Sequence, residues 1–430
     1  MPADGFRKVF DKQGLQKYKH RNGLTVIFRP KKNAESVTLE IGSRAGLVHH
    51  PLTHLDHHMI LRGTPVKTGI EIKKEAVQLA NTFDCFTDFY STVVFMKIDK
   101  RASVRQSFQL LCDIIRNPSM DAAALAKEKP VVILEIKHWN EEPKRILRQS
   151  IFRAVYKLHP ARKVILEDPQ VTAEATRAKV VEIHKKFYGS PQRLVIVAVG
   201  KFNPTRLLKM IGHCFGDLPK RIEDPFGVPE EEMSRKTIKP IVCRWRGKEA
   251  HLMLGFRAPL CYHSDYYPMR LLSGILGEDL DSRLYTELRE KTGLVHIRGP
   301  LNPASEYDAS PWHGVFYIYA PCSPHNLSAI KKIIQKELRK LAQERVPEEE
   351  LRRNKKKLII QHILSLEGTK KHAHSLFAAE INGTLEKFDD FSHRIQTVKA
   401  EDIQRAARTY CHPSKLVCAA LKPPQKPREK

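Results

Sequence analysis

The sequence predicts an α+β protein made of two homologous α/β sandwich domains. Three observations support this class: the length of the chain, a segment that recurs near the end of each half, and the order of strand-like and helix-like stretches. A chain of 430 residues is longer than one hydrophobic core usually holds and suits two domains of about 200 residues each. Hydrophobic residues make up 41% of the chain and charged residues 28%, as in globular proteins.

The recurring segment has the pattern Tyr-x-x-Pro-x-(Arg/Lys)-Leu-Val. It occupies residues 188–195 in the first half and residues 410–417 in the second. A helical stretch precedes it both times, and an apolar strand follows. A repeat of this kind indicates two copies of one structural unit, and Tyr188 and Tyr410 are expected to occupy equivalent positions.

Both halves also place alternating, strand-like stretches ahead of amphipathic helices. The strand-like stretches are 23–28, 37–41 and 92–96 in the first half, and 250–256 and 314–319 in the second. Strands followed by helices in two matching halves predict two α+β sandwiches. Residues 218–240 carry four prolines and an acidic run and are predicted to link an N-terminal domain (1–217) to a C-terminal domain (241–430).

Composition excludes several classes of protein. The net charge of +26 comes without a stacking motif, zinc finger or helix-turn-helix signature, so nucleic acid is not the expected partner and a solvated basic surface is. The chain has no run of 18 apolar residues and no apolar secretory signal. Eight scattered cysteines without a C-x-x-C pair predict reduced thiols. We therefore expect a protein of the cytoplasm or the mitochondrial matrix, neither transmembrane nor secreted.

The segment 52–64 is the most informative in the chain. His54 and His58 are four residues apart, so on a helix both rings project from one face and can share a metal ion. Two ordinary surface histidines at this spacing are the alternative. Downstream, Glu128 and Glu135 are seven residues apart, on one face of a second helix. Two imidazoles and one carboxylate would leave open the fourth position of a catalytic zinc site.

These segments resemble the inverted zinc motif of the pitrilysin/insulinase family, which includes the mitochondrial processing peptidases. The resemblance extends to Gly42-Ser43-Arg44, to 132–135 and to a second signature at 282–295. It implies a zinc cofactor held by His54, His58 and Glu135, with Glu128 as a supporting carboxylate. It further implies a peptide substrate and two domains that form a clam-like half-chamber. A second family chain would complete the chamber in a homodimer or a heterodimer.

The chain departs from the family motif at the residue that activates water. The family has a glutamate where this chain has His57, which becomes the candidate catalytic residue. Asp56 cannot simply replace that glutamate, because it lies two residues after His54 and points roughly 160° away on an ideal helix. Loss of a positioned base costs roughly 10²–10⁴-fold in rate. Two functions follow from this departure: a zinc peptidase with an altered base, or an inactive partner or structural core subunit of a larger complex.

Two further expectations concern the surroundings of this motif. Pro130 lies between Glu128 and Glu135 and is expected to kink or end their helix. His372 and His374 are two residues apart, a spacing that suits no helical ligand pair, and are expected at the surface.

Overall fold

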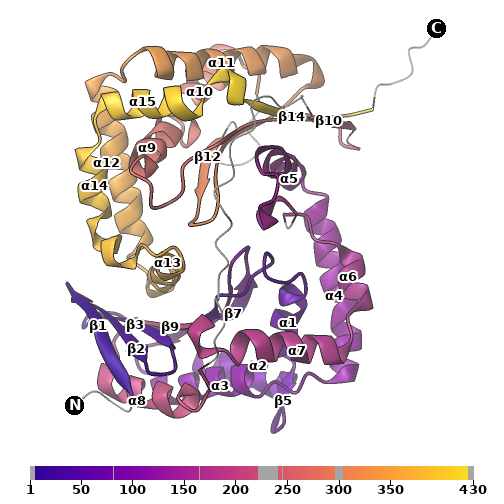
Figure 1. Cartoon of the computed structure of the whole chain (residues 1–430), viewed down its shortest axis with the longest axis vertical. Helices are drawn as coiled ribbons and strands as arrows, with labels where there is room; N and C mark the ends of the chain where they lie inside the picture. The colour runs from indigo at the N-terminus through magenta and orange to yellow at the C-terminus, as the bar shows by residue number, and fades with distance from the viewer. Residues whose placement is uncertain are drawn as a thin grey trace. The chain divides into compact units, whose positions relative to one another are not determined.

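The computed structural model describes residues 5–80, 82–163, 165–220, 241–244, 246–295 and 304–424. The chain forms two compact units, each built from segments of both halves (Figure 1). Unit 1 comprises residues 1–138, 167–227 and 363–388, and unit 2 comprises residues 139–166, 228–362 and 389–430. Strands and helices mix in both units, which confirms the α+β class. Boundaries at 217 and 241 stay a prediction, and most of the predicted linker, residues 221–240, lies outside the described residues.

Unit 1 contains a seven-stranded sheet with the order β1-β2-β3-β9-β4-β8-β7. Its strands are β1 (Phe6–Lys12), β2 (Leu15–His20), β3 (Thr25–Pro30), β4 (Ser36–Ser43), β7 (Thr82–Thr87), β8 (Thr92–Asp99) and β9 (Leu194–Gly200). Strands β5 (Gly63–Thr64) and β6 (Lys67–Thr68) form a separate short pair. The helices of this unit are α1 (Thr53–Ile60), α2 (Gly69–Leu79), α3 (Val104–Arg116), most of α4 (Ala122–Asn140), α6 (Pro169–Glu174), α7 (Arg177–Tyr188), α8 (Pro204–Phe215) and α13 (Thr369–Ile381).

Unit 2 contains a five-stranded sheet with the order β10-β14-β11-β13-β12. Its strands are β10 (Ile241–Arg244), β11 (Ala250–Arg257), β12 (Ala304–Ala309), β13 (Gly314–Cys322) and β14 (Val417–Lys422). Its helices are α5 (Pro143–Val155), α9 (Tyr266–Gly277), α10 (Arg283–Tyr285), α11 (Leu327–Gln343), most of α12 (Glu348–Ser365), α14 (Phe391–Thr397) and α15 (Ala400–Tyr410). Among the described residues, no helix is both long and apolar enough to cross a membrane.

The two sheets repeat one topology. In unit 1 the sequence β3-β9-β4-β8-β7 pairs first in parallel and then antiparallel three times, and β10-β14-β11-β13-β12 pairs in the same senses. Tyr188 ends α7 and Tyr410 ends α15, and each is followed by a 3-10 turn and then by β9 or β14. The predicted helix, turn and strand are therefore present in both halves, with the two tyrosines in matching places.

One face of each sheet is covered by a helix from the opposite half of the chain. On β4, Leu39 and Ile41 face the core that α3 and α8 share, whereas Thr38 and Glu40 contact Thr369 and His374 of α13. Figure 1 shows α13 on one side of this sheet and α3 and α8 on the other. In unit 2, α5 packs on β11 and β14 in the same way. Each sheet is thus buried on both faces, as its continuous apolar strands require.

This packing corrects the expectation for two histidines. His372 is 3% exposed, and His374 pairs through Nδ1 with the fully buried carboxylate of Glu40. A buried carboxylate needs a partner that donates hydrogen bonds or carries positive charge, and His374 supplies it. The two-residue spacing is poor evidence for exposure, because both residues lie on a helix that a sheet covers.

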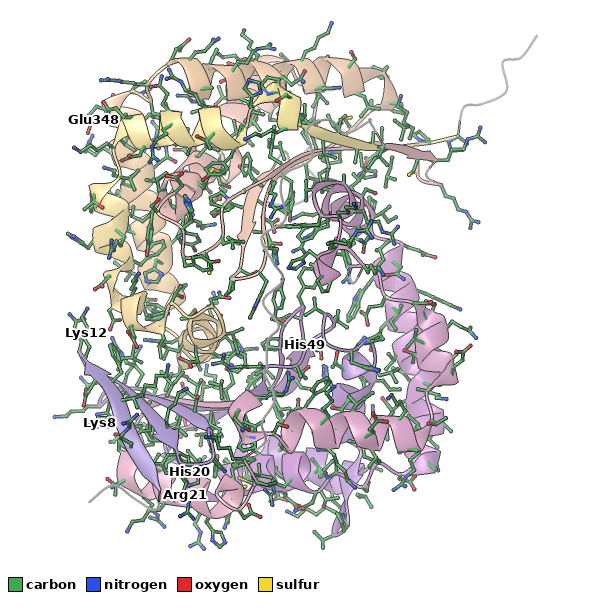
Figure 2. The ribbon with its side chains drawn as sticks, viewed as in Figure 1. Lys8, Lys12, His20, Arg21, His49 and Glu348 are labelled. Carbon is green, nitrogen blue, oxygen red and sulfur yellow. The ribbon has the colours of Figure 1, made fainter. Side chains whose placement is uncertain are left out.

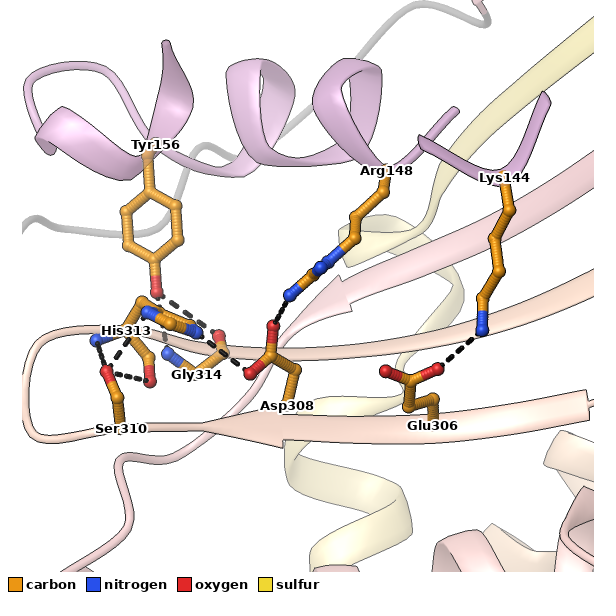
Figure 3. Close-up of polar contacts among 8 residues, drawn as sticks. All are labelled: Lys144, Arg148, Tyr156, Glu306, Asp308, Ser310, His313 and Gly314. Atoms are coloured by element: carbon orange, nitrogen blue, oxygen red, sulfur yellow. Dashed lines mark hydrogen bonds and ion pairs between the residues drawn. The ribbon is translucent and has the colours of Figure 1, made fainter. Parts of the chain in front are cut away.

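Polar contacts hold α5 against the hairpin of β12 and β13 (Figure 3). Lys144 Nζ lies 2.8 Å from a Glu306 carboxylate oxygen, and Arg148 pairs with Asp308. The Tyr156 hydroxyl donates to the carbonyl of Gly314 at 3.2 Å and accepts from its N–H at 2.8 Å. These contacts fix the helix at both ends.

The hairpin turn places Ser310, His313 and Asp308 in one hydrogen-bonded row (Figure 3). His313 lies 3.0 Å from each of its two neighbours. This row is not a nucleophilic triad, because Ser310 Oγ accepts the backbone N–H groups of Trp312 (3.1 Å) and His313 (2.9 Å). His313 is 2% exposed. The row instead orders the turn and holds Asp308 for Arg148.

We call α13 and α5 the exchanged helices, because each covers a sheet made largely from the other half of the chain. A glycine lies in the strand where each exchanged helix contacts its sheet. A Cβ at Gly42 would lie 2.2 Å from the Phe377 ring of α13, and a Cβ at Gly255 would lie 2.5 Å from Ile151 of α5. Gly42 pairs with Val195, and Gly255 pairs with Val417, so the two glycines are equivalent in the repeat. Close approach of a helix to the strand explains glycine at both sites.

We expect Gly255→Ala to lower the free energy of unfolding by about 1–3 kcal/mol, because the added methyl overpacks a buried contact with Ile151. Gly274→Ala is the matched control. Its Cβ would meet nothing closer than 3.9 Å inside α9, and it should be neutral or stabilise by about 0.5–1 kcal/mol. Urea unfolding of both variants measures the difference. Equal stabilities would show that α5 does not press on β11 at this glycine.

Candidate metal centre

The loop before α1 positions the helix that carries the histidine motif. His49 is labelled in Figure 2. Its Nδ1 accepts the N–H of Gly46 at 3.0 Å, and His50 Nδ1 accepts the N–H of Leu52 at 3.1 Å. Burial lowers the pKa of His49 to about 4, with a further contribution from Arg193. The ring is therefore neutral near pH 7 and can accept a hydrogen bond. These turns replace a side-chain cap, which α1 lacks.

His54, His58 and Glu135 come together as the spacing predicts. The His54 and His58 rings lie 5.1 Å apart between centroids. A single oxygen, Glu135 Oε2, lies 3.5 Å from His54 Nε2 and 3.4 Å from His58 Nε2. One ligand atom from each residue falls within 4.8 Å of the other two. The three side chains thus converge on one point from α1 and α4.

A second layer of carboxylates contacts the far side of both rings. His54 Nδ1 lies 3.2 Å from Glu167, and His58 Nδ1 lies 3.2 Å from Glu128. Glu128 also pairs with Arg62 at 2.7 Å. A carboxylate at Nδ1 holds the proton there and directs the lone pair of Nε2 toward Glu135. Each histidine is therefore set in the tautomer and orientation that a metal ligand needs.

Helix α4 does not end at Pro130, which corrects one of the two outcomes expected for this proline; a kink stays a prediction. The helix runs unbroken from Ala122 to Asn140 with Pro130 inside it. Glu128 and Glu135 consequently keep a common face toward α1, as their contacts with His58 show. Proline removes one intrahelical hydrogen bond, and packing of the buried Leu125, Val132 and Ile136 offsets that loss.

His57 lies beside the two predicted ligands but points its Nδ1 elsewhere. Its ring centroid is 6.0 Å from that of His54 and 5.2 Å from that of His58. Thr92 Oγ1 donates to the carbonyl of Ala45 at 2.7 Å, so the 3.2 Å contact between Thr87 and Thr92 requires Thr87 to donate. Thr87 can then only accept from His57 Nδ1, at 3.0 Å. The lone pair of His57 is therefore on Nε2.

The electrostatics of this position weaken His57 as a base. Burial, with smaller contributions from His58 and His54, lowers its pKa to about 3. A neutral imidazole of such low basicity holds a proton poorly near pH 7. Asp56, the neighbouring acid, faces the other way, with Oδ1 at 3.2 Å from His184 of α7. Its side chain contacts α7 and not the group around Glu135, as the helical geometry predicts.

Three contacts of this site were not anticipated from the sequence. Glu167 comes from the segment before α6, Thr87 from the edge strand β7, and Arg62 from the end of the motif itself. Glu167-Asp168-Pro169 looks like an ordinary helix start, and Asp168 does cap α6. No local pattern distinguishes Glu167 from a surface acid, whereas Arg62 lies four residues after His58 and was within reach of helical spacing.

Comparisons with known proteins identify the family of this chain. Residues 31–169 match the family model described as insulinase (peptidase family M16), and residues 174–358 match the one described as the peptidase M16 inactive domain. An uncharacterized zinc protease of Rickettsia felis is 26% identical over 355 residues, 81% of this chain and 82% of that protein.

Two solved structures share the fold over nearly the whole chain. A protease from Helicobacter pylori has a TM-score of 0.85 at 21% identity and covers 95% of this chain and 99% of its own. A Pseudomonas fluorescens structure, described as a peptidase M16 inactive domain, has a TM-score of 0.83 at 19% identity and covers 96% and 100%. Because one family model matches the first half of the chain and another matches the second, this chain belongs to the pitrilysin/insulinase family of zinc peptidases.

Proposed function

We propose that the chain binds one zinc ion through His54, His58 and Glu135 and acts on short unfolded peptides, with hydrolysis weakened by His57. The observation that carries this proposal is the convergence of two Nε2 atoms on one oxygen of Glu135, at 3.5 and 3.4 Å. Neutral imidazole and carboxylate are the donor types that zinc takes in catalytic sites.

The donor set also passes a test of fit. Both Nδ1 atoms are already engaged by Glu167 and Glu128, so both Nε2 lone pairs face the shared space. Three converging donors leave a fourth position for water or substrate. A zinc ion held there would supply Lewis acidity toward a peptide carbonyl and acidify a water molecule.

The residues of the chain would then have separate tasks. Glu128 and Glu167 hold the two imidazoles, and Arg62 neutralises Glu128 from 2.7 Å. His57 offers Nε2 as the acceptor of the proton that an attacking water must lose. Its lowered pKa makes it a weaker acceptor than the carboxylate found at this position in the family, and a slow reaction follows.

A direct test is metal analysis of the purified protein together with cleavage of a generic unfolded peptide. We expect about one zinc ion per chain and slow cleavage that a chelator abolishes. A wild-type protein purified without chelator and free of metal would refute the zinc site. Cleavage at rates ordinary for the family would refute the weakened base.

The replacement of the base also favours a second candidate function. A homologue that cannot hydrolyse peptides could complete a peptide chamber with an active partner, or serve as a structural core subunit. In that case zinc would be bound, cleavage by the purified chain would be absent, and addition of an active family chain would restore it. The assembly of the chain into a homodimer or heterodimer stays a prediction. Its location in the cytoplasm or the mitochondrial matrix also stays a prediction.

Glu167 is expected to matter for zinc affinity. Replacing it with glutamine removes the charge that orients His54, and loss of such a partner typically weakens metal binding about 10–100-fold. Competition with a chromogenic chelator measures the affinity. Glu174→Gln, at an exposed carboxylate of α6, is the matched control and should bind zinc as the wild type does. Equal affinity in both variants would contradict an orienting role for Glu167.

A further inference from the structure

Helices α3 and α8 lie on the face of the first sheet that α13 does not cover (Figure 1). A groove lies between the two helices and is lined by residues of both. Its volume is about 630 Å³, within the range of about 300–1,000 Å³ typical of small-molecule sites. A hollow of about 290 Å³ adjoins it at the N-terminal ends of both helices and shares Arg105, Arg206 and Met210 with it. No residue of the candidate metal centre lines either space.

The floor of the groove is apolar. Phe108 and Cys112 are buried there, and Met210 and Cys214 are half-buried. Cys112 lies in hydrogen-bonding contact with Cys214, and burial raises the pKa of the Cys112 thiol, which therefore stays protonated near pH 7. A floor of this kind suits an alkyl chain, because an alkyl chain needs no hydrogen-bonding partner.

The lining carries four cations, Arg105, Arg116, Arg206 and Lys209, and one carboxylate, Asp113. At the C-terminal end, Arg116 is held by both oxygens of Asp217, at 3.0 and 2.7 Å. Arg105 and Arg206 lie at the other end and Lys209 lies in the middle of α8; all three are exposed and make no ion pair with any described residue.

The same end holds the N-termini of both helices. Ser103 caps α3 and Asn203 caps α8, so each side chain accepts only one of the free N–H groups. The remaining N–H groups add partial positive charge to that of Arg105 and Arg206.

We propose that this groove binds a single-chain amphiphile of the long-chain carboxylate class. The carboxylate would lie between Arg105 and Arg206, where both helix N-termini favour an anion. The alkyl chain would follow Phe108 and Met210 toward Cys214. The site is independent of the proposed metal centre. Its cations are part of the chain's net charge of +26, and the proposal gives these cations a specific ligand.

The test is a calorimetric titration of the full-length protein with dodecanoate at concentrations below its micellar concentration. Alkylation of Cys214, followed by peptide mass mapping, reports whether the ligand occupies the groove. We expect saturable binding and slower alkylation of Cys214. The double variant Arg206→Glu/Lys209→Glu should bind at least about tenfold more weakly.

Arg352→Glu/Lys356→Glu is the matched control, because it reverses two exposed cations of α12 and changes the net charge equally. Its affinity should change by less than about twofold. Met210→Trp fills the floor without altering charge and should abolish binding while circular dichroism stays unchanged.

Several results would overturn the proposal. These are no saturable binding, equal binding by the groove variant and its control, or unprotected Cys214. If dodecyltrimethylammonium bound as tightly as dodecanoate, the cations would not contribute to recognition. If inorganic phosphate bound as tightly as dodecanoate, the apolar floor would not contribute. An acidic peptide that binds the groove more tightly than dodecanoate would assign the surface to a protein partner instead.

Discussion

His58→Ala is expected to leave the purified protein without zinc. The substitution removes one of the two imidazole nitrogens that lie near Glu135 Oε2 and also leaves the buried Glu128 without one of its partners. Two remaining ligands hold zinc far more weakly than three, because the free energy of metal binding comes from the bonds to the ligands and is coupled to the ordering of those ligands. Mass spectrometric metal analysis of wild type and variant measures the loss directly.

His325→Ala serves as the control, because His325 is an exposed histidine in unit 2. It should retain the zinc content of the wild type, about one ion per chain. The melting temperature separates loss of metal from loss of fold: chelator-treated wild type and His58→Ala should melt at similar temperatures, both below the zinc-loaded wild type. Retention of full zinc by His58→Ala would show that the ion is held elsewhere.

The fold was largely predictable because its signals are local. The pattern around Tyr188 and Tyr410 encodes a helix end, a turn and a strand within eight residues, and both copies fold as that pattern indicates. His54 and His58 lie on one helix, where a four-residue spacing fixes their common face. Glu135 depended on the family spacing, since nothing local in α4 separates it from other acids.

What sequence reasoning did not anticipate depends on tertiary contacts. The exchange of α5 and α13 between the two sheets leaves only faint traces, such as a glycine at 42 and at 255. Without knowledge of the exchange, His374 looks like a surface residue, although it pairs with the buried carboxylate of Glu40. Helix α4 continues through Pro130 for a related reason, because the buried side chains before and after the proline pack in the core and outweigh its low helix propensity.

His57→Glu is expected to raise peptide hydrolysis by roughly 10²-fold or more when zinc is bound. A carboxylate at this position is a stronger proton acceptor than an imidazole whose pKa is about 3 for reasons of burial, and a nearby cation would keep it ionised. Thr87 can turn its proton from Thr92 toward the new carboxylate, so the side chain finds a hydrogen bond in place. Turnover of an unfolded peptide, normalised to zinc content, is the measurement.

His57→Gln separates the charge of the new side chain from its shape. Glutamine has the length of glutamate and can keep the contact with Thr87, but it accepts no proton, so it should stay as slow as the wild type or slower. A wild type faster than His57→Glu would mean that His57 works as a base in its own geometry. If His57→Glu binds zinc and stays inert alone but cleaves peptide once a second family chain is added, the missing groups belong to that partner. If it stays inert even then, the weakened base is not the cause of low activity.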